Sequence, residues 1–265
     1  MKNIFKKMYV YLILIFFYAP IAILIFYSFN ASKSRAVWAG FTVKWYSELF
    51  QNTEIIHALF NTLIVAIAAT VISMIIGTIG AIGLYNSKSR LKKVVMESNY
   101  LPMLNPDIVI AVSLVALYNF MKLEFGYLTL IMSHVAFTAP YVLFNVMPRL
   151  MTMDPNMYEA AIDLGANRWQ AFRMVVLPEI KPGILSGALM AFTLSIDDFV
   201  VSFFTTGNGI QNISITVWSM ARRGINPTIN ALSAIMFVVM ISLTVFIYIR
   251  NQREVKKRYE KLQGI

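Results

Sequence analysis

Six apolar runs of membrane-spanning length constrain this chain more than any other feature of its sequence. A helix needs roughly 20 consecutive apolar residues to cross the hydrocarbon core of a bilayer. Hydrophobic residues make up 58% of the 265 residues, too large a share for a soluble domain of this size. The sequence therefore predicts an all-α integral membrane protein with six transmembrane helices. The runs are 8–29, 58–85, 94–120, 127–148, 182–205 and 230–249.

The distribution of Lys and Arg predicts how these helices are oriented. Of the 23 such residues, 17 lie in the amino terminus, the 86–93 loop, the 149–181 loop and the carboxyl tail. Because positive residues mark the cytoplasmic side of a membrane, both termini and the 149–181 loop are expected inside. The net charge of +10 then faces anionic membrane lipid, and it needs no nucleic acid as a partner.

A polar stretch, 154–178, interrupts the apolar pattern and indicates two short helices joined by a glycine. Asp154 and the proline after it favour the start of the first helix. Gly165 stands where a left-handed C-terminal cap is needed, a conformation that costs glycine little. Asn167 can cap a second helix, which the Leu-Pro pair ending at Pro178 is expected to terminate. The predicted elbow lies outside the bilayer.

The same stretch carries a family signature. Glu-Ala-Ala is followed by three residues, glycine, nine residues, an aliphatic residue, one more residue and Leu-Pro. This pattern resembles the signature loop of permease subunits of binding-protein-dependent ABC importers, although Val175 stands where the family usually has isoleucine. The resemblance implies a type I ABC importer permease fold and a loop that couples to a separate ATPase. Without the resemblance, the loop is a connector packed under the membrane. The residues assigned to coupling are Glu159, Ala160, Ala161, Asp163 and Gly165.

The resemblance also implies the partners. They are a homologous permease subunit that forms a heterodimer, two copies of an ATP-binding subunit and an extracytoplasmic substrate-binding protein, in a bacterial inner membrane. The chain lacks the GxxxxGK[ST] phosphate loop, so ATP and Mg²⁺ are expected on the separate ATPase. No cofactor, catalytic residue or metal site is expected here, since the chain has no cysteine and only two separated histidines. His134 is expected to be packed or hydrogen-bonded.

Three carboxylates lie inside predicted spans, where a charge costs at least about 2.5–3.5 kcal/mol and needs a partner. Asp107 lies about midway through the third run, where Asn105 is placed to cap a restarted half-helix. Asp107 either stabilises that half-helix or lines the substrate path.

Asp197 and Asp198 lie at a similar depth in the fifth run. On a continuous helix, Asp198 shares a stripe with Ser195 and Ser202, whereas Asp197 points about 100° away. Asp198 is therefore the favoured pore-lining residue, and Asp197 fits a subunit interface.

These spans contain no Lys or Arg near that depth, which favours an organic cation as the substrate. The alternative is that the aspartates are protonated or structurally paired. The segments FTLSIDDFVVSFFTTG, NPDIVIAVSL and GFTVKWY resemble the second permease subunit of spermidine/putrescine importers. An ABC permease for another small solute and a proton-coupled secondary carrier of organic cations are the alternative functions. By the resemblance, the translocation path includes Trp45, Asp107, Ser195, Asp197 and Asp198.

Trp45 belongs to an external segment whose aromatic residues recur at helical spacing from Phe41 to Phe50. It either anchors an amphipathic helix at the headgroups or caps the outer end of the path by cation–π attraction. The external 206–229 loop is expected to be a solvated face. The chain is expected to have three parts: a first transmembrane helix with an external amphipathic segment (1–57), the importer transmembrane domain (58–250) and a basic cytoplasmic tail (251–265).

Overall fold

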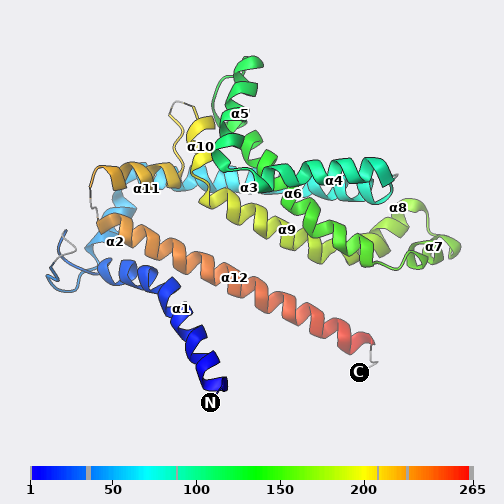
Figure 1. The fold of residues 1–265 in the computed structure, drawn as a ribbon, viewed down its shortest axis with the longest axis horizontal. Helices are drawn as coiled ribbons and strands as arrows, with labels where there is room; N and C mark the ends of the chain where they lie inside the picture. Colours follow the sequence, from blue (N-terminus) through cyan, green and yellow to red (C-terminus); the bar gives the residue numbers. More distant parts are fainter. Residues whose placement is uncertain (1, 34–36, 88, 208, 225–226, 263–265) are drawn as a thin grey trace. The chain divides into compact units, whose positions relative to one another are not determined.

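The structure is a computed structural model that describes residues 2–33, 37–87, 89–207, 209–224 and 227–262. These residues are predominantly helical, as predicted (Figure 1). They form two compact units: a central unit of residues 57–216, and a terminal unit that combines 1–56 with 217–265. The helices are α1 (Lys2–Tyr27), α2 (Lys44–Gln51), α3 (Thr53–Tyr85), α4 (Ser89–Leu104), α5 (Asp107–Phe120), α6 (Tyr127–Thr152), α7 (Asn156–Asp163), α8 (Arg168–Ala171), a π-helical turn (Phe172–Val176), α9 (Leu177–Asp197), α10 (Val200–Thr205), α11 (Ile213–Arg222) and α12 (Pro227–Leu262).

The described residues include four continuous helices that are long and apolar enough to cross a membrane. A fifth span results if α4 and α5, which are bent by 109° at their junction, count as one broken span. The predicted sixth run, 230–249, lies within α12, although the side chains of 243 and 246–248 fall outside the described residues. The count of six spans and the cytoplasmic position of both termini stay predictions.

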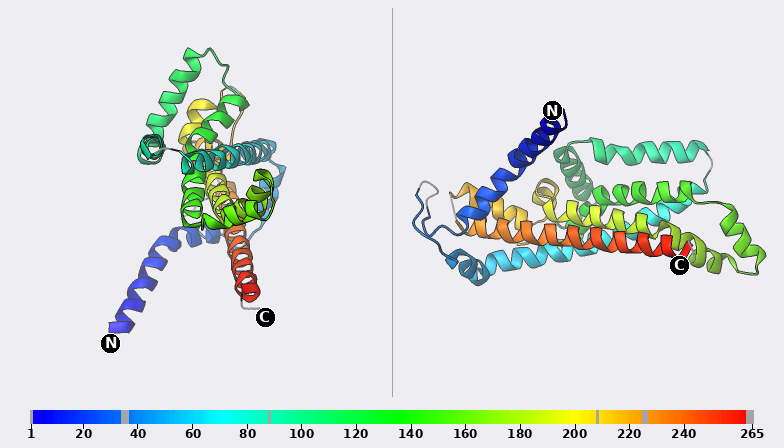
Figure 2. Two further views of the ribbon diagram at one scale, coloured as in Figure 1. Left: turned by 90° about the vertical axis from the view of Figure 1, so that its right-hand side faces the viewer. Right: turned by 90° about the horizontal axis from the view of Figure 1, so that it is seen from below.

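The core of the central unit is the antiparallel pair of α6 and α9, which lie side by side in both views of Figure 2. Val142 of α6 lies against Gly187 of α9, and towards the other end His134 lies against Ser195. A Cβ atom at Gly187 would lie 2.7 Å from Val142 Cα. The glycine is therefore needed for this close approach, as is usual between membrane helices.

The α3 helix packs on the same part of α6. A Cβ atom at Gly77 would lie 2.7 Å from Val142 Cβ, and the hydroxyls of Ser73 and Thr138 are 2.7 Å apart in a hydrogen bond. Small residues and a buried hydroxyl pair thus hold α3 and α6 in register. The packing of α3, α6 and α9 in this register places His134 of α6 beside Ser195, near the end of α9.

In the terminal unit, α2 confirms the predicted amphipathic helix over Lys44–Gln51. Trp45 and Leu49 are its buried residues, and the Trp45 indole N–H donates to the Asn30 carbonyl over 2.6 Å. Phe41 lies before the helix, in an isolated bridge with Asn30. Its exposed ring therefore belongs to the turn rather than to the helix.

Candidate functional site

The fifth apolar run contains a helix break at its two aspartates. The α9 helix ends at Asp197, Asp198 is extended (ψ 125°), and α10 begins at Val200. The Asp198 carboxylate accepts hydrogen bonds from the backbone N–H groups of Val201 (3.2 Å) and Ser202 (2.7 Å). First-turn N–H groups lack partners within their helix and favour a negative charge. The prediction of a continuous helix is therefore wrong, because Asp198 caps the next helix instead.

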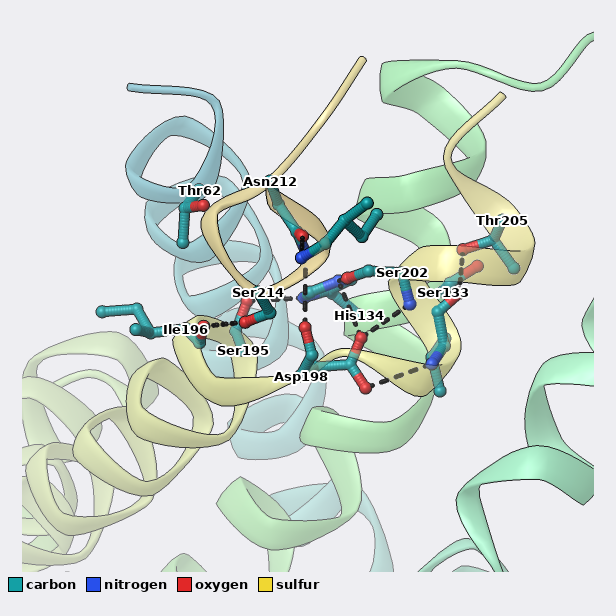
Figure 3. Close-up of polar contacts among 12 residues, drawn as sticks. Thr62, Ser133, His134, Ser195, Ile196, Asp198, Ser202, Thr205, Asn212 and Ser214 are labelled. Carbon is teal, nitrogen blue, oxygen red and sulfur yellow. Dashed lines mark hydrogen bonds and ion pairs between the residues drawn. The ribbon is translucent and has the colours of Figure 1, made fainter. Parts of the chain in front are cut away.

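The imidazole of His134 joins the two sides of this break (Figure 3). Its Nδ1 lies 2.6 Å from the hydroxyl of Ser195 on α9, and its Nε2 lies 2.9 Å from the hydroxyl of Ser202 on α10. Nε2 is also 3.7 Å from Oδ2 of Asp198. The relative exposure of His134 is 1%, so the prediction of a packed or hydrogen-bonded histidine is confirmed.

A second polar group, Asn212, holds the break from the loop that follows α10. Its side-chain amide donates to the Asp198 carbonyl over 3.3 Å, and its side-chain oxygen accepts from Ile215 N–H over 2.9 Å. The next backbone N–H, that of Ile213, donates to the Thr62 hydroxyl of α3 over 2.8 Å. Asn212 is 2% exposed, so the expectation that the whole 206–229 loop is solvated is wrong for this part.

A cavity of about 310 Å³ lies beside the break and brings three predicted residues together. Asp107, Asp197 and Asp198 all border it, with the aromatic rings of Phe137 and Tyr141. The residues Asp107 and Asp197 are exposed. The Asp198 side chain is only 8% exposed, because its carboxylate is turned towards α10. Carboxylates and aromatic faces both attract organic cations.

The other two predicted path residues lie elsewhere. Ser195 is 1% exposed and faces His134 rather than the cavity. Trp45 belongs to the terminal unit, where it borders a different cavity with Glu48 and Glu54. The cavity at the break therefore contains three of the five residues.

The third apolar run is broken before α5, as predicted, but α5 is not capped by the predicted residue. Pro106 is the residue that precedes the first turn, with φ −58° and ψ 139°, and no side chain caps the helix. The prediction that Asn105 caps α5 is wrong, because Pro106 occupies the capping position and its fixed φ starts the helix. Asp107 stands in the first turn, as predicted.

Sequence reasoning missed the partners of His134 and the role of Asn212. The available signal was that polar side chains in an apolar span must find hydrogen-bond partners. That rule predicts that partners exist, but it does not name them. Ser195 lies 61 residues from His134 and Ser202 lies 68 residues from it, so only the packing of α6 on α9 pairs them.

Each of the two short helices of the elbow begins with a hydrogen bond from the backbone to a side chain. The Asp154 carboxylate accepts from Asn156 N–H over 2.9 Å at the start of α7. At the start of α8, the side chains of Asn167 and Gln170 each accept from the other residue's backbone N–H, both over 2.9 Å. This reciprocal pair is a capping box, and it confirms the predicted cap at Asn167.

Gly165 closes α7 in the predicted left-handed conformation, with φ +89°. Its N–H donates to Ile162 O (2.9 Å), and the N–H of Ala166 donates to Ala161 O (3.1 Å). These two bonds form a Schellman motif, which satisfies the last carbonyls of a helix. A Cβ atom at Gly165 would meet nothing within 4 Å, so conformation, and not space, selects glycine here.

The prediction that Leu177 and Pro178 end the second helix of the elbow is wrong. The α8 helix continues through the π-helical turn Phe172–Val176 into α9, which gives an unbroken helical stretch of 30 residues, Arg168–Asp197. Pro178 is the second residue of α9 and follows directly on the π-helical turn, so the helix continues through this proline. The elbow is thus built directly onto the fifth span.

The elbow is largely exposed. Of the residues assigned to coupling, Ala161 is half-buried and the other four are exposed. The elbow also presents large apolar side chains to its surroundings. Exposed apolar surface of this kind marks contact sites in proteins. The apolar side chains are Leu164 (89% exposed), Trp169 (67%) and Met174 (72%).

Comparison with known families agrees with this architecture. Residues 69–260 match the family described as binding-protein-dependent transport system inner membrane component. The chain belongs to this family. Its members are inner-membrane permease subunits, so the fold class predicted from the signature loop is confirmed, and the transport role agrees with a non-catalytic subunit.

The chain is also similar to individual members of this family and to solved structures of ABC transporters. The chain is 36% identical to the spermidine/putrescine transport system permease protein PotC of Haemophilus influenzae, over 91% of this chain and 93% of that one. It is 36% identical to the putrescine transport system permease protein PotI of Escherichia coli, over 83% and 81%. A bacterial ABC transporter involved in alginate import has the same fold, with TM-score 0.69 and 21% identity over 95% and 98% of the chains.

Proposed function

We propose that this chain is the permease subunit of an ATP-driven importer that moves polyamines, spermidine or putrescine, into the bacterial cytoplasm by alternating access. The observation that carries the proposal is the cavity at the helix break, bordered by Asp107, Asp197 and aromatic rings. Polyamines carry several separated ammonium groups, which carboxylates attract at short range and aromatic faces attract as well. The names of the PotC and PotI relatives support the same substrate class.

The α9 helix supports a mechanical link between the cavity and the elbow. It has 21 residues, and a helix of that length extends about 30 Å. The elbow precedes its first residue and the aspartate break follows its last (Figure 1). A displacement of the elbow would therefore reach the cavity through one rigid element, which is what alternation between two access states needs.

The elbow is the proposed docking site for the ATPase. Its exposed apolar side chains suit burial in a partner's groove, and the exposed Glu159 and Asp163 suit basic groups on that partner. ATP and Mg²⁺ would be bound by two copies of this separate subunit. A homologous permease would complete the heterodimer in the inner membrane, and an extracytoplasmic binding protein would deliver the substrate.

Reconstitution tests this proposal. The tagged chain is purified from its native cells with its associated subunits, the subunits are identified, and the complex is inserted into liposomes with its binding protein. We expect a phosphate-loop ATPase and a second permease to copurify, and labelled spermidine or putrescine to enter only with ATP. The matched control is the same complex with the phosphate-loop lysine of the ATPase replaced.

Each contrary result points to a different alternative. ATP-driven uptake of a different solute, without competition by polyamines, would keep the importer class and reject the substrate. Uptake that needs a proton gradient and no ATPase would reject the importer class in favour of a secondary carrier.

A further inference from the structure

We propose that His134 is a positioning residue that gives the two adjacent aspartates different roles: Asp197 faces the transported cation, and Asp198 holds the helix break. This inference rests on the proposed function, and it assigns the substrate-facing carboxylates of the cavity as Asp107 and Asp197. It reverses the ranking that a continuous helix would produce, in which Asp198 faces the pore.

The first step of the argument is how the break is held. Ser195 is on α9 and Ser202 is on α10, so the two hydroxyls lie on opposite sides of the break. One imidazole ring bonds both, over 2.6 Å and 2.9 Å. A neutral imidazole has one donor and one acceptor nitrogen, and serine hydroxyls can serve either, so both ring nitrogens are satisfied. His134 therefore bridges α9 and α10 directly.

The second step concerns Asp198. Its two carboxylate oxygens each accept one backbone N–H of α10, from Val201 and Ser202, and its own carbonyl accepts from Asn212. Its side chain is 8% exposed. Asp198 borders the cavity, but its charge is committed to the first turn of α10. A substrate ammonium would have to compete with these bonds.

The third step concerns Asp197. It is the last residue of α9, it is exposed, and it borders the cavity. Asp107 is exposed on the same cavity, from the start of α5. The α5 and α10 helices are packed together, so the bonds from His134 that orient α10 also affect the position of α5. Loss of these bonds would let α9 and α10 rotate relative to each other, and the Asp197 side chain would no longer be held in one direction.

Cysteine accessibility tests the geometry without any transported substrate. The chain contains no cysteine, so Asp197→Cys and Asp198→Cys each provide a single thiol in this subunit, whose labelling is measured on this subunit alone. The probe is a methanethiosulfonate reagent that carries a quaternary ammonium. We expect the thiol at 197 to react at least about tenfold faster than the thiol at 198, the ratio for roughly 1.4 kcal/mol of access free energy. Adding His134→Phe should bring the two rates to within about threefold.

Transport kinetics provide the second readout. We expect Asp197→Asn to raise the KM for spermidine by about tenfold, as the loss of one charge-assisted contact implies, with a smaller change in maximal rate. Asp198→Asn should lower the maximal rate and leave KM within about twofold, because the amide oxygen still accepts one of the two N–H bonds. His134→Phe and Ser195→Ala should each raise KM, because each removes a bond that fixes the direction of Asp197, and Ser195→Thr, which keeps the hydroxyl, should restore it.

The control for removing a buried hydroxyl is Ser28→Ala, which breaks a bond to the Tyr46 hydroxyl in the terminal unit. It should leave KM near the wild-type value. Equal reaction rates at 197 and 198 with His134 intact would overturn the inference, as would a KM effect confined to Asp198→Asn. A complex that imports no polyamine would reject the proposed function alone, since the thiol rates need no substrate.

Discussion

The two ends of α9 are both irregular, but they are held in opposite ways. At the elbow, the capping bonds join residues two to five positions apart, as in the Asn167–Gln170 pair. At the aspartate break, the bonds of His134 reach residues 61 and 68 positions away. The elbow is exposed, whereas the side chains of His134, Ser195 and Ser202 that hold the break are buried. A local motif keeps its shape when a partner moves it, whereas a break set by tertiary contacts depends on how the helices around it are packed.

This difference suits the two proposed roles. The elbow must keep one shape while it moves with an ATPase, so bonds within its own short sequence are sufficient. The break must respond to the relative position of α6 and α9, since one histidine from α6 bonds both sides of it. Four substitutions sharpen or break this comparison.

The largest effect is expected where α6 and α9 approach most closely. Gly187→Leu would place a side chain against the Val142 backbone, where even a Cβ atom has only 2.7 Å. Overpacking of this kind costs up to about 3 kcal/mol. We expect a lower melting temperature of the purified complex and faster modification of a thiol at 198. Gly83→Ala is the control, because a Cβ atom there meets nothing within 4 Å. An unchanged melting temperature would contradict the close packing.

The next effect is expected at Asn212. Asn212→Ala removes the donor to the Asp198 carbonyl and the cap of α11, and it leaves buried polar groups unpaired. Such a loss costs about 1–3 kcal/mol. The melting temperature should therefore fall by several degrees, and it should fall less in Asn212→Ser, which keeps a capping oxygen but loses the amide donor. If both variants unfold like the wild type, the loop does not hold the break.

Gly165→Val is expected to act on coupling more than on stability. A β-branched residue at φ +89° costs about 1–2 kcal/mol. The substitution would therefore strain the two hydrogen bonds of the Schellman motif and distort the end of α7. We expect coupled uptake to fall by about tenfold while ATP hydrolysis continues. Gly165→Asn, which tolerates the left-handed conformation, should retain most uptake. Full uptake by the valine variant, or by a glutamate at this position, would reject the coupling role.

The smallest effect is expected at Asn167. Asn167→Ala removes one exposed cap of the same residue type as Asn212, and N-cap losses typically cost about 1 kcal/mol. The melting temperature should move less than in Asn212→Ala, and Asn167→Ser should retain the wild-type value. An equal or larger shift at Asn167 would contradict the proposed contrast between local and tertiary control, since both residues cap a helix but only Asn212 is buried and also bonds the Asp198 carbonyl.

The elbow shows how far sequence reasoning reached. Its glycine turn and its cap at Asn167 were predicted because their hydrogen bonds join near neighbours, and each residue type has one favoured place in such motifs. The same reasoning failed at Pro178, since a proline is compatible both with the end of a helix and with the first turn of another. The π-helical turn before α9 decided between the two.

The sequence alone determined the class of this protein: its apolar runs require helices in a membrane, and the spacing from Glu159 to Pro178 identifies an importer permease. It also predicted three carboxylates within membrane spans. Only the tertiary structure decided which carboxylate caps a helix and which are exposed, because directions predicted from the sequence assume a continuous helix. The helix is interrupted because Asp198 caps α10. The packing of α6 on α9 brings the His134 imidazole to both sides of this break. Those contacts join residues far apart in the chain, and no local pattern encodes them.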